Sequence, residues 1–312
     1  MSQPDRTLLL YQRPTLLRQD QHRNLKLTYD GSDFSFASQA NSFLLAATEI
    51  PEASLQYPVV FIGKEGGAYS LAVLVGLTDR QNLFVDASGR WAADSYVPAF
   101  VRRYPFVLLE EGPDRLSVGF DAAYPGFGDN AEQPLFEDGG APSPLLQHAI
   151  GFLEGFHAEM TLTRTFADRL AALGVLVPRV VEVSSGPRKA PRVLQGFYAV
   201  DPGKLAALPA AELAALASGP ELSWIYLHLN SLRLVNRLAA RVDALGARDV
   251  FPADAPVNVG TLPNQQPAAA AAGDAPVPAA SGKAAKSARP GGRTTAGQRG
   301  RRAARPDDGA LR

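Results

Sequence analysis

Arginine and aromatic side chains are concentrated in one stretch of the chain, residues 82–106. Arg90, Arg102 and Arg103 stand there beside rings that include Trp91 and Tyr104. A guanidinium stacked on an aromatic ring can hold an anion or a sugar, so these five residues form a candidate ligand site. Arginine is also the preferred residue for buried pairing with carbonyls and carboxylates, and we favour this structural interpretation of the stretch.

A second polar cluster lies in the segment YLHLNSL, residues 226–232. His228 and Asn230, with Ser231, interrupt an otherwise apolar helical pattern. These side chains can bind a ligand, but buried polar groups are routinely paired with one another or with the backbone. We therefore keep His228 and Asn230 as candidate ligand residues and favour a packed interface as their role.

Patterns for catalysis and metal binding are weaker. The chain contains no cysteine, which excludes thiolate nucleophiles and Cys-based metal sites, and it lacks the G-x-S-x-G motif of serine hydrolases. Asp86, Asp94 and Asp121 can supply a carboxylate pair, but nothing in the sequence places two of them together. Glu154 and His157 form a single E-x-x-H pair, whereas carboxylate-bridged metal proteins need two copies and two further glutamates. The sequence therefore predicts no catalytic residue, no metal and no cofactor, and it favours a non-enzymatic protein.

An α+β fold must position these side chains. Runs of alternating or β-branched residues predict strands at residues 24–29, 57–62, 69–76, 83–85, 106–109, 115–121, 180–183 and 193–200. Helical periodicity predicts a long helix over residues 145–173, capped by Ser143 and closed by Gly174. Further helices are predicted at residues 203–208, 209–218 and 221–245. We expect a mostly antiparallel sheet from residues 24–121, covered by the C-terminal helices of residues 143–173 and 203–245.

The composition changes after Val250. Of 31 basic and 31 acidic residues in the 312-residue chain, residues 251–312 hold nine and four, so the body is mildly acidic and the tail basic. An Ala/Pro/Arg-rich segment of this kind buries too little apolar surface to offset the entropy lost on ordering. We predict a globular domain over residues 1–250 and a disordered tail over residues 251–312. The cations of residues 283–305 predict weak, salt-dependent binding of polyanions; they are Lys283, Lys286, Arg289, Arg293, Arg299, Arg301, Arg302 and Arg305.

The N-terminal residues predict synthesis in the cytoplasm. They lack the apolar segment and small-residue cleavage site of a secretory signal peptide. No part of the chain approaches the run of about 20 apolar residues that a membrane-spanning helix needs. We expect a protein without a membrane-spanning segment that is cytoplasmic, or surface-associated by a signal-less route.

Six segments, in this order, carry a family resemblance: YPVVFIG (57–63), NLFVDASGRWAADSYVPAFVRRYPF (82–106), LFEDGGAPSPLLQ (135–147), TRTFADRLAALGVL (163–176), GFYAVDPGKLAALP (196–209) and YLHLNSL (226–232). The second is the most specific. On these segments the chain resembles the SapC family of bacterial proteins. The similarity spans roughly residues 10–245, and the basic tail lies outside it.

The resemblance implies a link to the bacterial cell surface, because the family is named for a component of a paracrystalline surface layer. It carries over no catalytic residue. We therefore expect a non-enzymatic protein that acts in surface-layer or envelope assembly by binding another protein or a glycan. The alternative is an enzyme or enzyme accessory protein with a ligand site around Trp91, Arg102, Arg103 and Tyr104.

Overall fold

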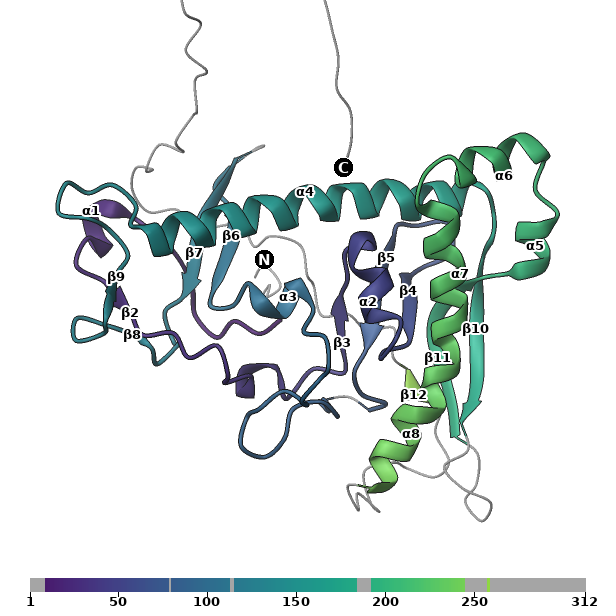
Figure 1. The fold of residues 1–312 in the computed structure, drawn as a ribbon, viewed down its shortest axis with the longest axis horizontal. Helices are drawn as coiled ribbons and strands as arrows, with labels where there is room; N and C mark the ends of the chain where they lie inside the picture. The colour runs from purple at the N-terminus through teal and green to yellow at the C-terminus, as the bar shows by residue number, and fades with distance from the viewer. Residues whose placement is uncertain (1–8, 79, 113–114, 184–191, 245–256, 259–312) are drawn as a thin grey trace, which may run out of the picture. The chain divides into compact units, whose positions relative to one another are not determined.

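Antiparallel sheets and C-terminal helices make up the structure, which confirms the predicted α+β class (Figure 1). The computed structural model describes residues 9–78, 80–112, 115–183, 192–244 and 257–258, and all of them belong to one compact unit. None of the helices in these ranges combines the length and apolar character required to cross a bilayer.

Two hairpins of β-branched and aromatic residues build the central sheet. β4 (Val59–Gly63) pairs with β5 (Tyr69–Leu74), and β10 (Leu176–Val183) pairs with β11 (Arg192–Val200), both antiparallel. Among the described residues, the strand pairing between the two hairpins consists of one residue pair, Tyr198 opposite Phe61. β3 (Ser42–Leu44) adds to β5, so the strand order is β10-β11-β4-β5-β3. The single β4–β11 bridge leaves main-chain groups of both strands without a strand partner.

The predicted extent of the sheet, residues 24–121, is wrong in two respects. The central sheet includes β10 and β11 from beyond residue 121, and the earlier strands are divided among three sheets. A second sheet has the order β1-β7-β6, and a small third sheet has the order β8-β2-β9. Their bounds are β1 (Pro14–Leu16), β7 (Leu116–Asp121), β6 (Phe106–Glu110), β8 (Phe127–Gly128), β2 (Lys26–Leu27) and β9 (Gln133–Pro134).

Helix α4 (Pro144–Ala172) runs past both larger sheets (Figure 1). It begins where predicted, because the Ser143 hydroxyl accepts a hydrogen bond from the Leu146 amide at 3.3 Å and Pro144 fits the first turn. Its N-terminal half buries Leu146 and Leu153 in one hydrophobic cluster, with Phe106 and Phe120 of the second sheet. From Phe156 onward it buries Phe156, Phe166 and Leu170 in the main cluster around the central sheet. One helix therefore contributes to two cores.

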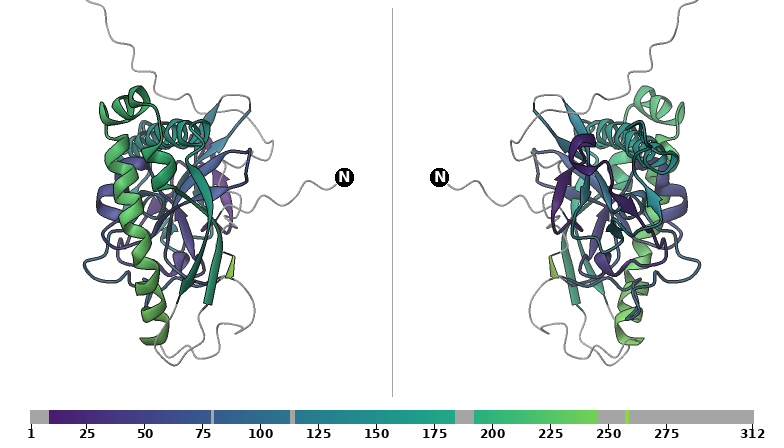
Figure 2. Two further views of the ribbon diagram at one scale, coloured as in Figure 1. Left: turned by 90° about the vertical axis from the view of Figure 1, so that its right-hand side faces the viewer. Right: turned by 90° about the vertical axis from the view of Figure 1, so that its left-hand side faces the viewer.

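The last helices cover one face of the central sheet (Figure 2). α7 (Glu221–Ser231) packs on β4 and β11, and a 3₁₀ turn (Leu232–Leu234) leads into α8 (Val235–Ala244), which contacts β10. α5 (Pro202–Ala206) and α6 (Ala210–Ala217) connect β11 to α7. Short helical turns elsewhere are α1 (Gln19–His22), α2 (Ile50–Ala53), α3 (Ala99–Arg102) and the 3₁₀ turns Ser35–Ala37 and Ala47–Glu49.

Most of the predicted tail lies outside the described residues. Within residues 251–312 the structure describes only β12 (Val257–Asn258), which pairs in parallel with Leu194 and Gln195 of β11. These two residues are therefore a strand, where the sequence predicted disorder. The boundary at residue 250 stays a prediction.

Candidate binding site

The central stretch, residues 82–106, forms a long loop followed by α3. The strand predicted at residues 83–85 is wrong. The structure has an isolated β-bridge there, between Val85 and Trp91. Trp91 is buried, and its indole Nε1 donates a hydrogen bond to the Tyr57 hydroxyl at 3.1 Å. Trp91 also packs against Phe34, Phe43 and Phe84. The tryptophan thus fixes the loop to the central core.

Arg102 and Arg103 lie at the end of α3, beneath α4. The exposed Arg102 donates from Nε to the Val97 carbonyl at 2.9 Å, and its Cζ lies 5.4 Å from the centre of the Phe152 ring. The Arg103 guanidinium lies over Phe100 at 4.1 Å, and its buried Nε has no hydrogen-bond partner among the described residues. Removal from water lowers the pKa of Arg103. Both cations therefore rest on aromatic rings.

A buried carboxylate anchors the beginning of α3. Glu49 accepts hydrogen bonds from the Ala46 amide at 2.9 Å, from the Ala99 amide at 2.7 Å and from the Tyr96 hydroxyl at 2.7 Å. Arg102 donates to the same Tyr96 hydroxyl at 3.2 Å, which couples its charge to Glu49. Burial, and next the charge of Glu49, raises the pKa of Tyr96 to about 12.

Tyr104 and Arg90 lie in different surroundings. The buried Tyr104 stacks on Phe36 with ring centres 3.9 Å apart, and its hydroxyl donates to Asp121 at 3.1 Å. Burial, and next Asp121, raises the pKa of Tyr104 well above its usual value. Arg90 is exposed, and its amide donates to Asp86 at 3.0 Å within a turn. The polar atoms of Trp91 and Tyr104 are therefore occupied within the fold.

His228 and Asn230 point to different environments. The fully buried His228 donates from Nδ1 to the Val59 carbonyl of β4 at 2.8 Å and accepts at Nε2 from the Val200 amide of β11 at 3.2 Å. Ser231 accepts from the Val59 amide at 2.9 Å. α7 thus supplies hydrogen-bond partners to main-chain groups of β4 and β11 that do not pair with each other. Desolvation lowers the pKa of His228 to about 4, and Asn230 is exposed.

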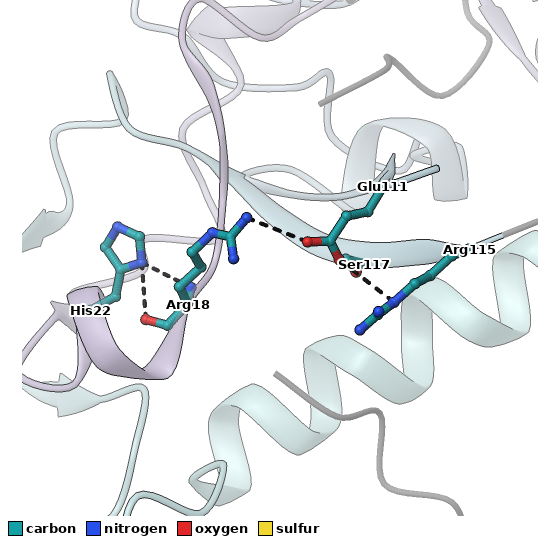
Figure 3. A network of polar contacts seen from close by, with 5 residues as sticks. All are labelled: Arg18, His22, Glu111, Arg115 and Ser117. Carbon is teal, nitrogen blue, oxygen red and sulfur yellow. Dashed lines mark hydrogen bonds and ion pairs between the residues drawn. The ribbon is translucent and has the colours of Figure 1, made fainter. Parts of the chain in front are cut away.

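Another polar network ties the N-terminal segment to the second sheet (Figure 3). Glu111, which follows β6, forms ion pairs with Arg18 at 3.3 Å and with Arg115 at 3.6 Å, and it accepts from the Ser117 hydroxyl at 2.5 Å. His22 accepts from the Arg18 amide at 2.9 Å, which closes the α1 turn. These groups satisfy one another, so the network is structural.

A pocket of about 140 Å³ opens beside the central stretch. One wall is the turn after α2, the second is the loop that contains Phe84 and Asp94, and the third is α8. Its lining residues are Leu55, Gln56, Phe84, Asp94, Ser95, Arg237, Leu238 and Arg241. No residue of the two clusters predicted from the sequence lines this pocket.

Gln56 and Arg241 give the pocket a defined shape. The Gln56 side chain donates to the Asp94 carbonyl at 2.9 Å and accepts from the Tyr96 amide at 2.6 Å. Asp94 itself has φ of 59°, a left-handed conformation that Asp and Asn tolerate better than most residues. Across the opening, the Arg241 guanidinium lies 4.1 Å from the centre of the Phe84 ring and reaches the Leu83 carbonyl at 3.4 Å.

Two charged side chains that line the pocket, Asp94 and Arg237, are exposed to solvent. Among the described residues, neither the Asp94 carboxylate nor the Arg237 guanidinium has a hydrogen-bond or ion-pair partner. The lining thus offers guanidinium donors, a carboxylate acceptor and an aromatic ring. Such a set can hold a small polar ligand by hydrogen bonds and charge.

Sequence reasoning missed this pocket, because its walls come from three separated segments. From the sequence, Asp94 is a candidate only for one member of a catalytic carboxylate pair. The available signal was the i, i+4 spacing of Arg237 and Arg241, which places two cations on one face of a helix. Nothing in that spacing shows which loop faces the helix.

The comparisons with known proteins agree with the resemblance read from the motifs. The family model described as SapC matches residues 17–238. No curated protein and no solved structure matches the chain.

Proposed function

The chain belongs to the SapC family, and from that premise we propose that it is a non-enzymatic binding component of the bacterial surface layer or envelope. It recognises a protein or glycan partner, and the pocket between residues 82–97 and α8 is its recognition site. Export by a signal-less route, or action at the cytoplasmic side of envelope assembly, belongs to the same proposal.

One observation carries the proposal: the pocket presents unused charges without the pairs that catalysis requires. A nucleophile needs a neighbouring base, and the lining contains no histidine beside Ser95. Glycoside hydrolysis generally uses two carboxylates, and the lining contains one, Asp94. Recognition needs only complementary donors and acceptors, which Asp94, Arg237 and Arg241 supply.

The alternative, an enzyme or accessory protein with a site around Trp91, Arg102, Arg103 and Tyr104, has less support from the geometry. The Trp91 nitrogen and the Tyr104 hydroxyl are bound inside the protein, and both side chains are buried. Only Arg102 of the four is exposed. A ligand would have to break internal contacts to reach the others.

Replacing Arg237 with alanine is expected to weaken binding to isolated cell envelopes by about tenfold or more. Loss of one hydrogen-bonded charge contact costs about 1.5–3 kcal/mol, and 1.4 kcal/mol corresponds to tenfold. The measurement is co-sedimentation of the full-length protein with purified envelope fragments over a range of protein concentrations.

Arg233→Ala is the matched control, since Arg233 is an exposed arginine of the preceding turn that does not line the pocket. It should bind like the parent protein. Failure of the parent protein to sediment with envelopes overturns the proposal. Equal binding by Arg237→Ala and the parent protein shows that the pocket is not the recognition site.

The basic tail gives a separate, salt-dependent expectation. Deletion of residues 259–312, which retains β12, should reduce retention on a heparin column, because it removes eight cations from the tail's main basic segment and one at the C-terminus. The measurement is the salt concentration at elution. Unchanged elution would show that the tail does not bind polyanions, and envelope sedimentation of the deleted protein separates the tail from the pocket.

A further inference from the structure

Opposite charges line the pocket without pairing with each other. Asp94 lies on the loop wall, and Arg237 and Arg241 lie on α8. No ion pair between described residues joins Asp94 to either arginine. Exposed charges gain little free energy by pairing in water, so both walls stay available to a ligand. A ligand with an anionic end and a donating end can satisfy both walls at once.

The α8 wall is arranged for a carboxylate. Arg237 and Arg241 are one helical turn apart, so their guanidinium groups are neighbours on one face. Phe84 and the Leu83 carbonyl hold Arg241 in place, which lowers the entropy lost when it binds. The forked N–H groups of arginine match the two oxygens of a carboxylate.

The loop wall is arranged for hydrogen-bond donors. An ionised carboxylate accepts hydrogen bonds only, so Asp94 selects hydroxyl or ammonium groups. Gln56 bonds the main chain on both sides of Ser95, at the Asp94 carbonyl and the Tyr96 amide, and this fixes the left-handed conformation of Asp94. The exposed Asp94 carboxylate is thereby held at the opening, where a ligand can reach it.

We infer that the pocket binds a compact ligand with a carboxylate at one end and hydroxyl or ammonium donors at the other. The carboxylate lies on Arg237 and Arg241, and the donors lie on Asp94. A pocket of about 140 Å³ suits a single sugar acid or a single acidic amino acid. This inference rests on the proposed function and names the chemical group that the partner presents.

The test is calorimetric titration of the full-length protein with D-glucuronate and with L-glutamate. Glucose, which lacks the carboxylate, and glutarate, which lacks the ammonium, are the matched probes. We expect at least one of the acids to bind, glucose to bind at least tenfold more weakly than glucuronate, and Arg237→Ala to weaken the bound acid at least tenfold. Arg233→Ala should leave binding unchanged.

Asp94→Asn separates the two walls, because asparagine also tolerates positive φ but lacks the negative charge. The variant should bind glucuronate or glutamate at least fivefold more weakly than the parent protein. Its affinity for glutarate should be unchanged or higher. Asp94→Gly serves the same purpose if the asparagine variant fails to fold, since glycine adopts this φ without strain.

Stronger binding of glucuronate indicates a glycan as the source of the group, and stronger binding of glutamate indicates the N-terminal acidic residue of a protein, which keeps its ammonium group. Absence of binding by both acids overturns the inference. So does binding of glucose with the same measurable affinity as glucuronate, or an equal loss of acid binding in Arg237→Ala and Arg233→Ala. If envelope co-sedimentation persists in that case, the proposed function stands. If the acids bind and envelopes do not, the proposed function fails and the ligand chemistry stands.

Discussion

Replacement of Asp121 with alanine is expected to lower the free energy of unfolding by about 3–5 kcal/mol. The carboxylate is fully buried and accepts four hydrogen bonds: from the amides of Gln12, Arg13 and Ala123, and from the Tyr104 hydroxyl. Each donor left unpaired in the interior costs about 1–3 kcal/mol, and the costs are not additive. The substitution therefore weakens the attachment of residues 12 and 13, which precede β1, to the end of β7.

Urea denaturation followed by circular dichroism measures this effect. Asp86→Ala is the matched control, because Asp86 also accepts hydrogen bonds from Ser88 and Arg90 amides but is exposed, so water replaces it. We expect Asp86→Ala to lower the free energy of unfolding by about 1 kcal/mol or less. Asp121→Asn should be intermediate, since an amide keeps one acceptor oxygen and turns an NH₂ group toward the other donors. Equal losses at residues 121 and 86 would contradict the account.

Replacement of His228 with leucine is expected to cost about 2–4 kcal/mol at pH 7. Leucine has a similar volume but leaves the Val59 carbonyl and the Val200 amide without partners in the core. The same change should alter the pH dependence of stability. Folded His228 has a pKa of about 4, and an unfolded histidine has a pKa of about 6.5.

The sign follows from which state binds the proton first. As the pH falls below about 6.5, the unfolded chain is protonated at His228 before the folded protein is, so the stability of the parent protein decreases down to about pH 4. The contribution over this window is on the order of 3 kcal/mol. The leucine variant lacks this titrating group and therefore its pH dependence. The difference in free energy of unfolding between the parent protein and the leucine variant should thus shrink as the pH falls from 7 to 4.

Urea titrations at several pH values between 4 and 7 test this expectation. The exposed His157 supplies the control, and His157→Gln should be as stable as the parent protein throughout. A constant difference between the parent and His228→Leu across the range would show that His228 is not the group whose burial depresses stability in acid.

Local signals predicted several elements well. The long helix was expected over residues 145–173 and is Pro144–Ala172, because a serine cap, a first-turn proline and a glycine with φ of 66° at residue 174 mark its ends. The strands at residues 57–62, 69–76, 106–109 and 115–121 were also predicted, from their apolar and β-branched runs, and they are β4, β5, β6 and β7.

Pairing between distant segments was not predicted, because periodicity describes a strand but not its neighbour. The β10–β11 hairpin joins the central sheet at one bridge, and the rest of that junction depends on His228 and Ser231 of α7. The sequence showed the polar cluster in the apolar helix. It could not show that His228 and Ser231 form hydrogen bonds with main-chain groups where β4 and β11 do not pair.

The candidate site shows the same limit. Residue types in the stretch 82–106 indicated that charge and aromatic rings gather there, and they do. Whether Trp91 and Tyr104 offer their polar atoms to a ligand depends on Tyr57 and Asp121, which are distant in the chain. The pocket likewise needs α8 to face the loop, and that arrangement is a consequence of packing rather than of local pattern.

Helix α4 also determines how the molecule comes apart. Leu153 belongs to the core beneath the second sheet and Phe156, three residues later, to the main core. Loss of packing in either core removes part of the tertiary contacts of one continuous 29-residue helix, and a helix without tertiary contacts is marginal in water. We therefore expect the two sheets to unfold in a single cooperative transition, because α4 packs in both cores.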